Sequence, residues 1–407
     1  MSRNVGLISF LLLIYISATA TFGQMGGSKP PRVFVLNGTV LQERRNAILS
    51  PKTAGRYAGP MKRLVSDANK ALKIEILPIT SKTVVPPSGD KHDYMTQAPY
   101  FWKDPAKKDG LPYIRRDGER NPEILKYPDH GLMDEMVKTT ETLAVGYYFT
   151  QNEEYAARTA TILRIWFLDA KTRMNPNLEY AQAIPGLNTG RGIGIIETHE
   201  LIRVVDAIGL LAGSKSWTKE DQTGLEGWFG KYVTWLTESK NGRDEAAAKN
   251  NHGTIYDVQL ASFALFAGKT DIAKRLIESA KLNRIAKQIE PDGKQPLELE
   301  RTKAWSYSTM NLGGFVELAQ LGDSIGVDLW GYQTTDGRSI RKAFEFLFPF
   351  ADGKKKWEYQ QIEPLLGERL YDQMRKAKDK YRDDKFKAEL SAIPAKVDES
   401  RDWLLLF

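Results

Sequence analysis

The 407-residue chain contains no cysteine and only four histidines. The missing cysteines exclude a disulfide framework and a lipid anchor attached to cysteine. After the first two dozen residues, no apolar run reaches the length of a transmembrane helix. No Ser/Gly-rich linker divides the chain, and no repeat of fixed period occurs. These absences predict a soluble protein with one globular body, stabilised by its hydrophobic core alone.

The N-terminus, MSRNVGLISFLLLIYISATATFGQ, combines one positive charge at Arg3 with an apolar core and small residues before Gly23. This is the pattern of a cleaved secretory signal, and its apolar core is short for a membrane span. We therefore predict a signal peptide over residues 1–23 and a single mature domain over residues 24–407. The mature protein is expected in the periplasm or the medium, without a membrane anchor.

The formal net charge of +7 suits a polyanionic partner, although the charge balance taken alone favours a solvated basic surface. The sequence has no arginine-rich arm, zinc finger or helix-turn-helix pattern. Nucleic acid is therefore not the expected partner.

From about residue 133 onward, apolar residues recur at intervals of three and four, which is typical of amphipathic helices. Asn152, Gly213 and Thr218 stand where neighbouring helices are expected to meet. Short turns between paired helices predict antiparallel hairpins in an array or a closed ring, an all-α fold. The last predicted helix, 375–390, is strongly charged and is expected to be solvated, without a function. The helical segments are 133–151, 152–168, 194–213, 218–239, 271–289 and 307–326.

Residues 82–130 show no sustained period and are rich in Pro, Gly, Asp and aromatic residues. A long irregular loop in a compact domain is often functional. Here Tyr100, Trp102 and Tyr113 lie beside Arg115 and Arg116. Aromatic rings can contact the C–H groups of sugars, and arginines can bind carboxylates. The alternative is a loop that its own aromatic side chains hold in place.

The stretch EAAAKNNHGTIYDVQLASFALFAG, residues 245–268, places Asn250, Asn251 and His252 before an apolar helix. A helix that begins near Asn251 is expected to leave its first N–H groups unpaired, with a partial positive charge that stabilises an anion. His252 could give or take a proton beside that anion. An asparagine cap with a packed histidine is the alternative.

A second segment, PLELERTKAWSYSTMNLGGF, residues 296–315, alternates apolar and acidic residues over 297–300 and so predicts an extended approach to a helix. Ser306 is expected to cap that helix, with Tyr307 in its first turn. Arg301 lies on the approach. A guanidinium near Tyr307 would lower the tyrosine pKa from its ordinary value of about 10.

These groups suit β-elimination in a polymer of uronic acids. The carboxyl group acidifies the hydrogen on C5 of the sugar, but its negative charge resists formation of a carbanion. Asn, His and Arg donors would neutralise that charge. A base then removes the hydrogen, and an acid protonates the departing O4. Tyrosine can perform both steps on one side of the ring, or histidine can be the base and tyrosine the acid.

The chain resembles the alginate lyase-type polysaccharide lyases, which have an α/α toroid fold. The resemblance lies in GDKHDYMTQAPYFWKDP, GLPYIRRDGERNPE, GLNTGRGIGIIET, KNNHG and ERTKAWSYSTMNL, over roughly residues 60–350. It implies an incomplete helical barrel in which Asn251, His252 and Arg301 neutralise the carboxylate and Tyr307 transfers protons. The spacing of Arg301 and Tyr307 is closest to polysaccharide lyase family thirty-eight.

The expected substrate is an acidic polysaccharide, with alginate ahead of glucuronan or another polyuronide. The mechanism requires no metal or organic cofactor, because side chains neutralise the carboxylate. The expected substrate-binding residues are His92, Gln97, Tyr100, Trp102, Tyr113, Arg115, Arg116, Asn188, Arg191 and Asn250.

Two rival functions remain at this stage. A hydrolase of unsaturated uronides would need a pair of carboxyl groups, and Asp117, Asp257, Glu298 and Glu300 are available. A non-catalytic glycan-binding protein is the second rival. His199 and Glu200 resemble half of a zinc-protease helix, but position 203 is Arg203, so a metal site is not expected.

Overall fold

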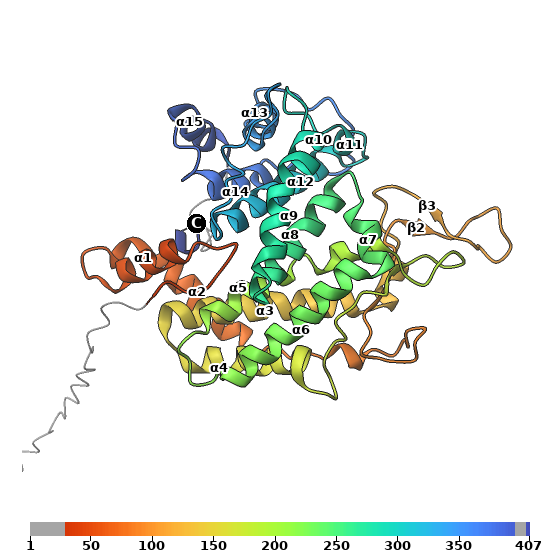
Figure 1. Cartoon of the computed structure of the whole chain (residues 1–407), viewed down its shortest axis with the longest axis horizontal. Helices are drawn as coiled ribbons and strands as arrows, with labels where there is room; N and C mark the ends of the chain where they lie inside the picture. The colour runs from red at the N-terminus through yellow and green to blue at the C-terminus, as the bar shows by residue number, and fades with distance from the viewer. Residues whose placement is uncertain (1–28, 395–403) are drawn as a thin grey trace, which may run out of the picture. The chain divides into compact units, whose positions relative to one another are not determined.

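Helices dominate residues 29–394 and 404–407, which are the residues described in the computed structural model. Residues 31–407 form one compact unit, shown in Figure 1. The predicted signal peptide, residues 1–23, lies outside the described residues. None of the helices in the described part of the chain is long and apolar enough to cross a membrane.

The all-α prediction is confirmed, and the described helices fall close to the segments expected from the sequence. The α-helices are α1 Gly38–Leu49, α2 Ala58–Ala71, α3 Asp129–Thr150, α4 Glu153–Leu163, α5 Leu201–Leu210, α6 Lys219–Glu238, α7 Lys240–Ala246, α8 Asn251–Phe266, α9 Thr270–Ala280, α10 Ala286–Gln288, α11 Pro296–Leu299, α12 Ala304–Asp323, α13 Ile340–Ala351, α14 Glu368–Ala377 and α15 Asp384–Ala392. Short 3-10 helices cover Ala54–Tyr57, Ile79–Ser81, Pro122–Lys126 and Gly192–Thr198, and π-helical turns cover Arg164–Leu168 and Lys281–Ile285.

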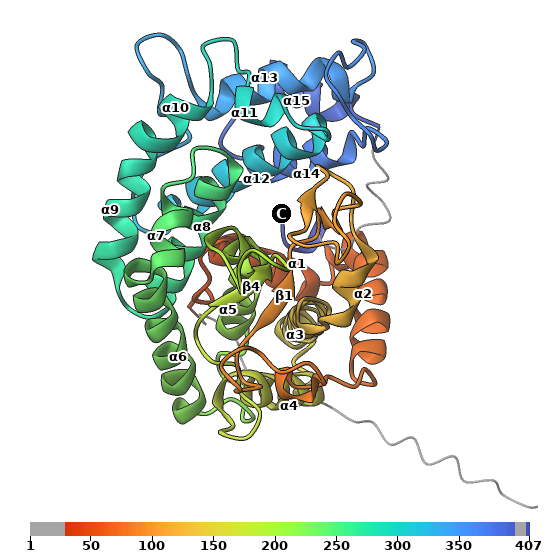
Figure 2. The same ribbon diagram turned by 90° about the vertical axis from the view of Figure 1, so that its right-hand side faces the viewer.

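The helices pack side by side around an incomplete toroid (Figure 2). Helix α3 packs against α5, α5 against α8, α8 against α12, and α12 against α14. Helices α2 and α4 cover α3, while α6 and α9 cover α8. As expected, Asn152 caps α4, and Thr218 forms a capping box with Asp221 at the start of α6.

Helix α8 lies at the centre of this arrangement, and every residue of it except His252 is buried. Apolar residues lie all around it, which suits a helix surrounded by other helices. The exception is informative, because His252, whose imidazole can transfer protons, is the one residue of the central helix that is not buried.

The expected irregular region contains three short strands within residues 82–130: β1 Met95–Gln97, β2 Phe101–Trp102 and β3 Ile114–Arg115. Strand β1 pairs in parallel with β4, Tyr180–Ala183, and β2 pairs antiparallel with β3. The pairing of β1 with β4 attaches the irregular region, residues 82–130, to the segment that leads into residues 188–198.

Two local expectations are wrong. Residues 296–299 form the short helix α11 instead of an extended approach, and α12 begins at Ala304 with Lys303 at its N-cap, so Ser306 is not a cap. Tyr307 still lies in the first turn of α12 and bonds through its N–H to the Lys303 carbonyl. The charged segment 375–390 is divided between α14 and α15, and it buries Phe386 in the core.

Candidate active site

Tyr307 and Arg301 meet at the start of α12. The Arg301 guanidinium lies over the Tyr307 ring, 3.9 Å from its centre. Asp117, from the irregular region, holds this arginine with two hydrogen bonds, Nη2 to Oδ1 at 2.8 Å and Nε to Oδ2 at 3.2 Å. The Tyr307 hydroxyl donates to the hydroxyl of Tyr100 at 3.2 Å. A phenol, a fixed guanidinium and a second phenol are thus brought together from segments far apart in sequence.

The pKa of Tyr307 shifts in the opposite direction to the sequence prediction. Burial raises the pKa of Tyr307 above its ordinary value, and the hydrogen bond with Tyr100 acts in the same direction. Arg301 does lower this pKa, as expected, but its contribution is smaller. The hydroxyl of Tyr307 is therefore held as a neutral phenol, a proton donor, in the free protein.

The start of α8 also differs from the prediction, because its first N–H groups are already paired. The Asn251 N–H donates to Glu298 Oε1 at 2.7 Å, and the N–H groups of His252 and Gly253 bond to the side chain and carbonyl of Asn250. Glu298 also accepts from Asn251 Nδ2 at 2.6 Å. The anion at this helix terminus is thus a carboxylate of the protein itself.

Asn251 is completely buried, and its Oδ1 has no partner within the described residues. Glu298, which is 1% exposed, fixes the amide orientation, because its carboxylate can only accept. Burial raises the pKa of Glu298, while the two bonds from Asn251 oppose that increase. Both partners are therefore held rigidly beneath the site.

His252 is oriented by Glu245 of α7. Its Nδ1 lies 2.6 Å from Glu245 Oε1, and the Glu245 side chain is almost fully buried. A proton on Nδ1 would leave Nε2 as an acceptor, the arrangement that a carboxylate imposes on a histidine that acts as a base.

Arg191 supplies a further cation to this region. Its guanidinium bonds to the carbonyl and side chain of Gln182 and lies over the Phe101 ring. No carboxylate in the described part of the chain lies within ion-pair distance of it. Burial and, to a smaller extent, the positive charge of Arg115 lower the pKa of Arg191 to about 10.

Charge interactions connect these groups into one constellation. Arg115 and Arg301 share Asp117 Oδ1. The charges of Arg115 and Glu245 both act on Arg191, and those of Arg301 and His252 both act on Glu298. The structure therefore places all four residues of the predicted signature, Asn251, His252, Arg301 and Tyr307, in one charged neighbourhood.

The aromatic loop residues have mixed surroundings. Trp102 carries the Arg116 guanidinium over its ring, 5.3 Å from the centre, and donates through Nε1 to the Glu119 carbonyl. The Tyr113 hydroxyl donates to Glu123 at 2.6 Å, and burial raises its pKa to about 12. The loop is thus pinned partly by its own aromatics, while Arg115 and Arg116 remain exposed.

Other predicted binding residues have structural contacts of their own. Asn188 accepts the Ile184 N–H within a turn, and His92 Nδ1 lies 2.6 Å from the Arg173 carbonyl. Neither residue contacts the signature residues. Asn250 is the N-cap of α8. Gln97 is buried at the end of β1, and its Nε2 has no partner in the described residues, so it retains a donor for a ligand.

Sequence reasoning missed the anchoring role of three carboxylates, Asp117, Glu245 and Glu298. The sequence indicates Asp117 and Glu298 only as candidates for the carboxyl pair of a hydrolase. Burial acts to raise the pKa of Asp117, but Arg301 holds that pKa well below its usual range. The signal that could have identified them is chemical: buried cations and amides need fixed acceptors.

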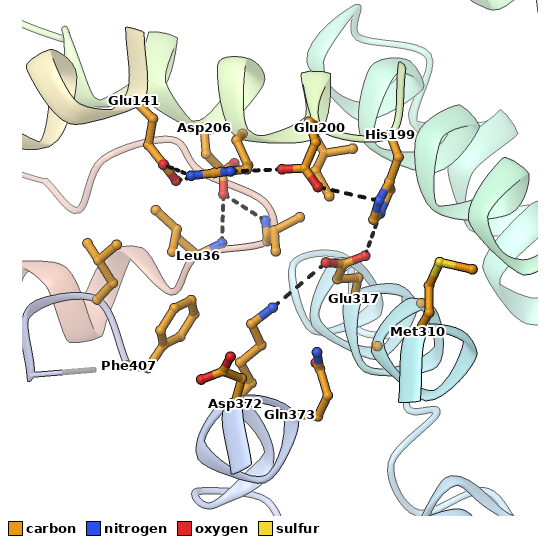
Figure 3. A pocket seen from close by; sticks show the side chains of 17 residues that line it. Leu36, Glu141, His199, Glu200, Asp206, Met310, Glu317, Asp372, Gln373 and Phe407 are labelled. Atoms are coloured by element: carbon orange, nitrogen blue, oxygen red, sulfur yellow. Dashed lines mark hydrogen bonds and ion pairs between the residues drawn. The ribbon is translucent and has the colours of Figure 1, made fainter. Parts of the chain in front are cut away.

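A second polar cavity surrounds His199 beside the middle of α12 (Figure 3). His199 Nε2 lies 2.7 Å from Glu317, and Arg203 bridges Glu141 and Glu200. The cavity of about 570 Å³ is lined by five carboxylates but only by Arg203 and Lys376 as permanent cations, a poor match for a polyanion. No group of side chains suited to a metal occurs among the residues described.

Known proteins provide an independent comparison. The model of the alginate lyase family matches residues 78–357. A crystal structure of an alginate lyase from Bacteroides ovatus is 39% identical, covers 93% of this chain and 99% of its own, and superposes with a TM-score of 0.88. Alginate lyase A1-III, solved with a tetrasaccharide, is 15% identical over 94% of this chain and 97% of its own, with a TM-score of 0.58, and supports the fold.

No curated protein sequence matches the chain. The family match and the similar structure nevertheless extend over most of the residues that carry the constellation, from Gln97 to Tyr307. This chain belongs to the alginate lyase family and is a polysaccharide lyase.

Proposed function

We propose that the chain cleaves an acidic polysaccharide, alginate in the first place, by β-elimination at the constellation around Tyr307. The observation that carries the proposal is the contact of the Arg301 guanidinium with the Tyr307 ring. Asp117 fixes Arg301 in this position, and the Tyr307 hydroxyl donates a hydrogen bond to the hydroxyl of Tyr100. Alginate is favoured because the similar structure from Bacteroides ovatus is of an alginate lyase.

Carboxylate neutralisation is assigned to Arg301 and Asn251, because His252 is assigned to removal of the hydrogen on C5. Arg301 Nη1 has no hydrogen-bond partner in the described residues, and Asn251 Nδ2 retains one hydrogen beyond its bond to Glu298. Because the Asn251 side chain has no exposed surface, its direct contact with the sugar carboxylate requires the covering residues to move when substrate binds. Arg115 and Arg191 add positive charge to the same region, which favours the developing negative charge.

Proton transfer is assigned to Tyr307 and His252. The raised pKa of Tyr307 favours the phenol form, which suits protonation of the departing O4. His252, oriented by Glu245, retains Nε2 as an acceptor and suits removal of the hydrogen on C5. This division places histidine as the base and tyrosine as the acid.

A hydrolase mechanism is disfavoured by the positions of its candidate carboxyl groups. Asp117 binds Arg301, Asp257 binds the buried Arg284, and Glu298 binds Asn251. Glu300 is exposed. Asp117, Asp257 and Glu298 are thus each committed to orienting another side chain, and none of the three is free to act as one of a pair.

Two finer assignments remain part of the proposal. The spacing of Arg301 and Tyr307 supports an assignment to polysaccharide lyase family thirty-eight. The composition of residues 1–23 supports export to the periplasm or the medium through a cleavable signal.

The test uses the purified protein with a panel of polyuronides, followed by ultraviolet absorbance of the conjugated double bond. A lyase creates this absorbance, whereas a hydrolase of unsaturated uronides consumes it. The Tyr307→Phe variant should lose turnover, by roughly a thousandfold or more if proton transfer is rate-limiting, while it still binds oligosaccharide. Tyr332→Phe, a change on a partly exposed tyrosine outside the constellation, is the matched control. Normal turnover by Tyr307→Phe would remove the proposed role of the phenol.

A further inference from the structure

We propose that a cationic groove beside the α7–α8 corner binds uronate residues of the same polymer, outside the site of cleavage. This groove is defined by Arg243, Lys249, Arg284 and Lys287 and is called the corner groove below. The proposal rests on the proposed function, because it takes the polyanionic substrate as the occupant. It adds a second binding site to the reaction centre.

The corner groove is a cavity of about 750 Å³ between α7, α8 and α9. Helices α7 and α9 both pack against α8 (Figure 2). The groove takes residues from the end of α6, the α7–α8 connection and the start of α10, and Leu297, which is 42% exposed, lies at one edge. A cavity of this size holds a small ligand or a short stretch of a polymer.

The charge of the corner groove is strongly unbalanced. Four cations line it, and its one carboxylate, Asp257, is buried and bound by Arg284. Arg243, Lys249 and Lys287 are exposed, and none of them has an ion-pair partner in the described part of the chain. Unpaired cations around a concave surface attract a polyanion.

The groove has a rigid floor. Arg284 is buried, binds Asp257 with two hydrogen bonds and donates to the carbonyls of Ala246 and Ala248. A Cβ at Gly253 would lie 2.1 Å from the Ala248 carbonyl oxygen and 2.4 Å from Arg284, so only glycine permits this approach. The backbone that presents Lys249 is therefore fixed before a ligand arrives, which reduces the entropic cost of binding.

A small cavity of about 60 Å³ adjoins the corner groove near the start of α8. It shares Lys249, Lys287 and Leu297 with the groove, and it is also lined by Asn250 and Glu298, which hold the start of α8. The corner groove thus lies close to Asn250, the residue that caps α8 and precedes Asn251 and His252. The cavity around His199 provides the contrast, because carboxylates dominate its lining.

The experiment compares the triple variant R243Q/K249Q/K287Q with a control triple variant, K62Q/K171Q/K231Q. The control lysines are equally exposed, have no ion-pair partner in the described residues and do not line the groove. Both variants lose three positive charges, so their net charge changes equally. Arg284 is left intact because its removal would disturb the fold.

For each variant, kcat/KM is measured on alginate polymer and on a trisaccharide, and polymer binding is measured by calorimetry at low and high salt. The groove variant should lose roughly fivefold to tenfold in kcat/KM and in affinity for the polymer at low salt, from three exposed charge interactions. Its kcat/KM on the trisaccharide should stay near that of the unaltered protein, and the control variant should be unaffected on both substrates.

Two outcomes would contradict polymer binding in the corner groove. One is an unchanged polymer affinity in the groove variant, and the other is an equal loss of kcat/KM on trisaccharide and polymer. If the unaltered protein shows no turnover on any polyuronide, the proposed function fails. The calorimetric measurement of polymer binding still tests the corner groove in that case, because it does not depend on turnover.

Discussion

Replacing Glu298 with glutamine tests the anchoring of the α8 N-terminus most directly. The carboxylate accepts from the Asn251 N–H at 2.7 Å and from Asn251 Nδ2 at 2.6 Å. Glutamine has nearly the same shape but only one acceptor oxygen. In Glu298→Gln, one bond must therefore be lost, and the new amide NH₂ faces a donor of Asn251.

The magnitude follows from these two bonds. A hydrogen bond to a charged group contributes about 1.5–3 kcal/mol, and both bonds here are buried, so stability should fall by about 2 kcal/mol. The larger effect is expected on activity. A small displacement of a positioned group costs roughly a hundredfold in rate, equivalent to about 2.7 kcal/mol of transition-state stabilisation.

The assay is initial-rate kinetics on alginate by ultraviolet absorbance, together with thermal unfolding. Because the lost contact supports the transition state, kcat and kcat/KM should fall together while KM changes little. Glu300→Gln is the matched control, since Glu300 is exposed in the same segment and should show neither effect.

Unchanged kcat in a folded Glu298→Gln protein would refute the anchoring role. A loss that appears only in KM would refute it too, since the residue would then support ground-state binding alone. If Glu300→Gln reproduced the loss of activity, the effect would belong to the charge of the segment.

Three further predictions concern other parts of the chain. Asp117→Asn should lower kcat/KM by roughly tenfold to a hundredfold, because the half-buried Arg301 loses its carboxylate partner; retention of full activity would contradict this. Burial acts to lower the pKa of His199, but its carboxylate partner on α12 raises it overall. Its stabilising contribution is therefore complete below the unfolded pKa of about 6.5 and is lost as pH rises through the raised folded pKa. The stability difference between the unaltered protein and His199→Gln should accordingly shrink as pH rises above about 6.5 in chemical denaturation, and a pH-independent difference would exclude the charge interaction. Gly253→Ala should lower stability by about 1–3 kcal/mol or more through overpacking against the α7–α8 corner, whereas Gly227→Ala, which meets no atoms within 4 Å, should be neutral or stabilising in the same unfolding assay.

The sequence by itself determined the helical class and the main helices, because apolar periodicity is a local property that the chain carries without its partners. It also marked Asn251, His252, Arg301 and Tyr307 as one chemical set. The roles of these residues remain predictions, although the structure brings them into one charged neighbourhood.

Only the tertiary structure decided how those groups are held. The carboxylate on Asn251 comes from 47 residues away and the one on Arg301 from 184 residues away, separations that no periodicity reveals. The same is true of the Tyr307 pKa: the sequence shows a nearby arginine, but burial, which outweighs it, exists only after folding. Local patterns thus predicted the elements and the chemistry, while packing set the electrostatics of the site.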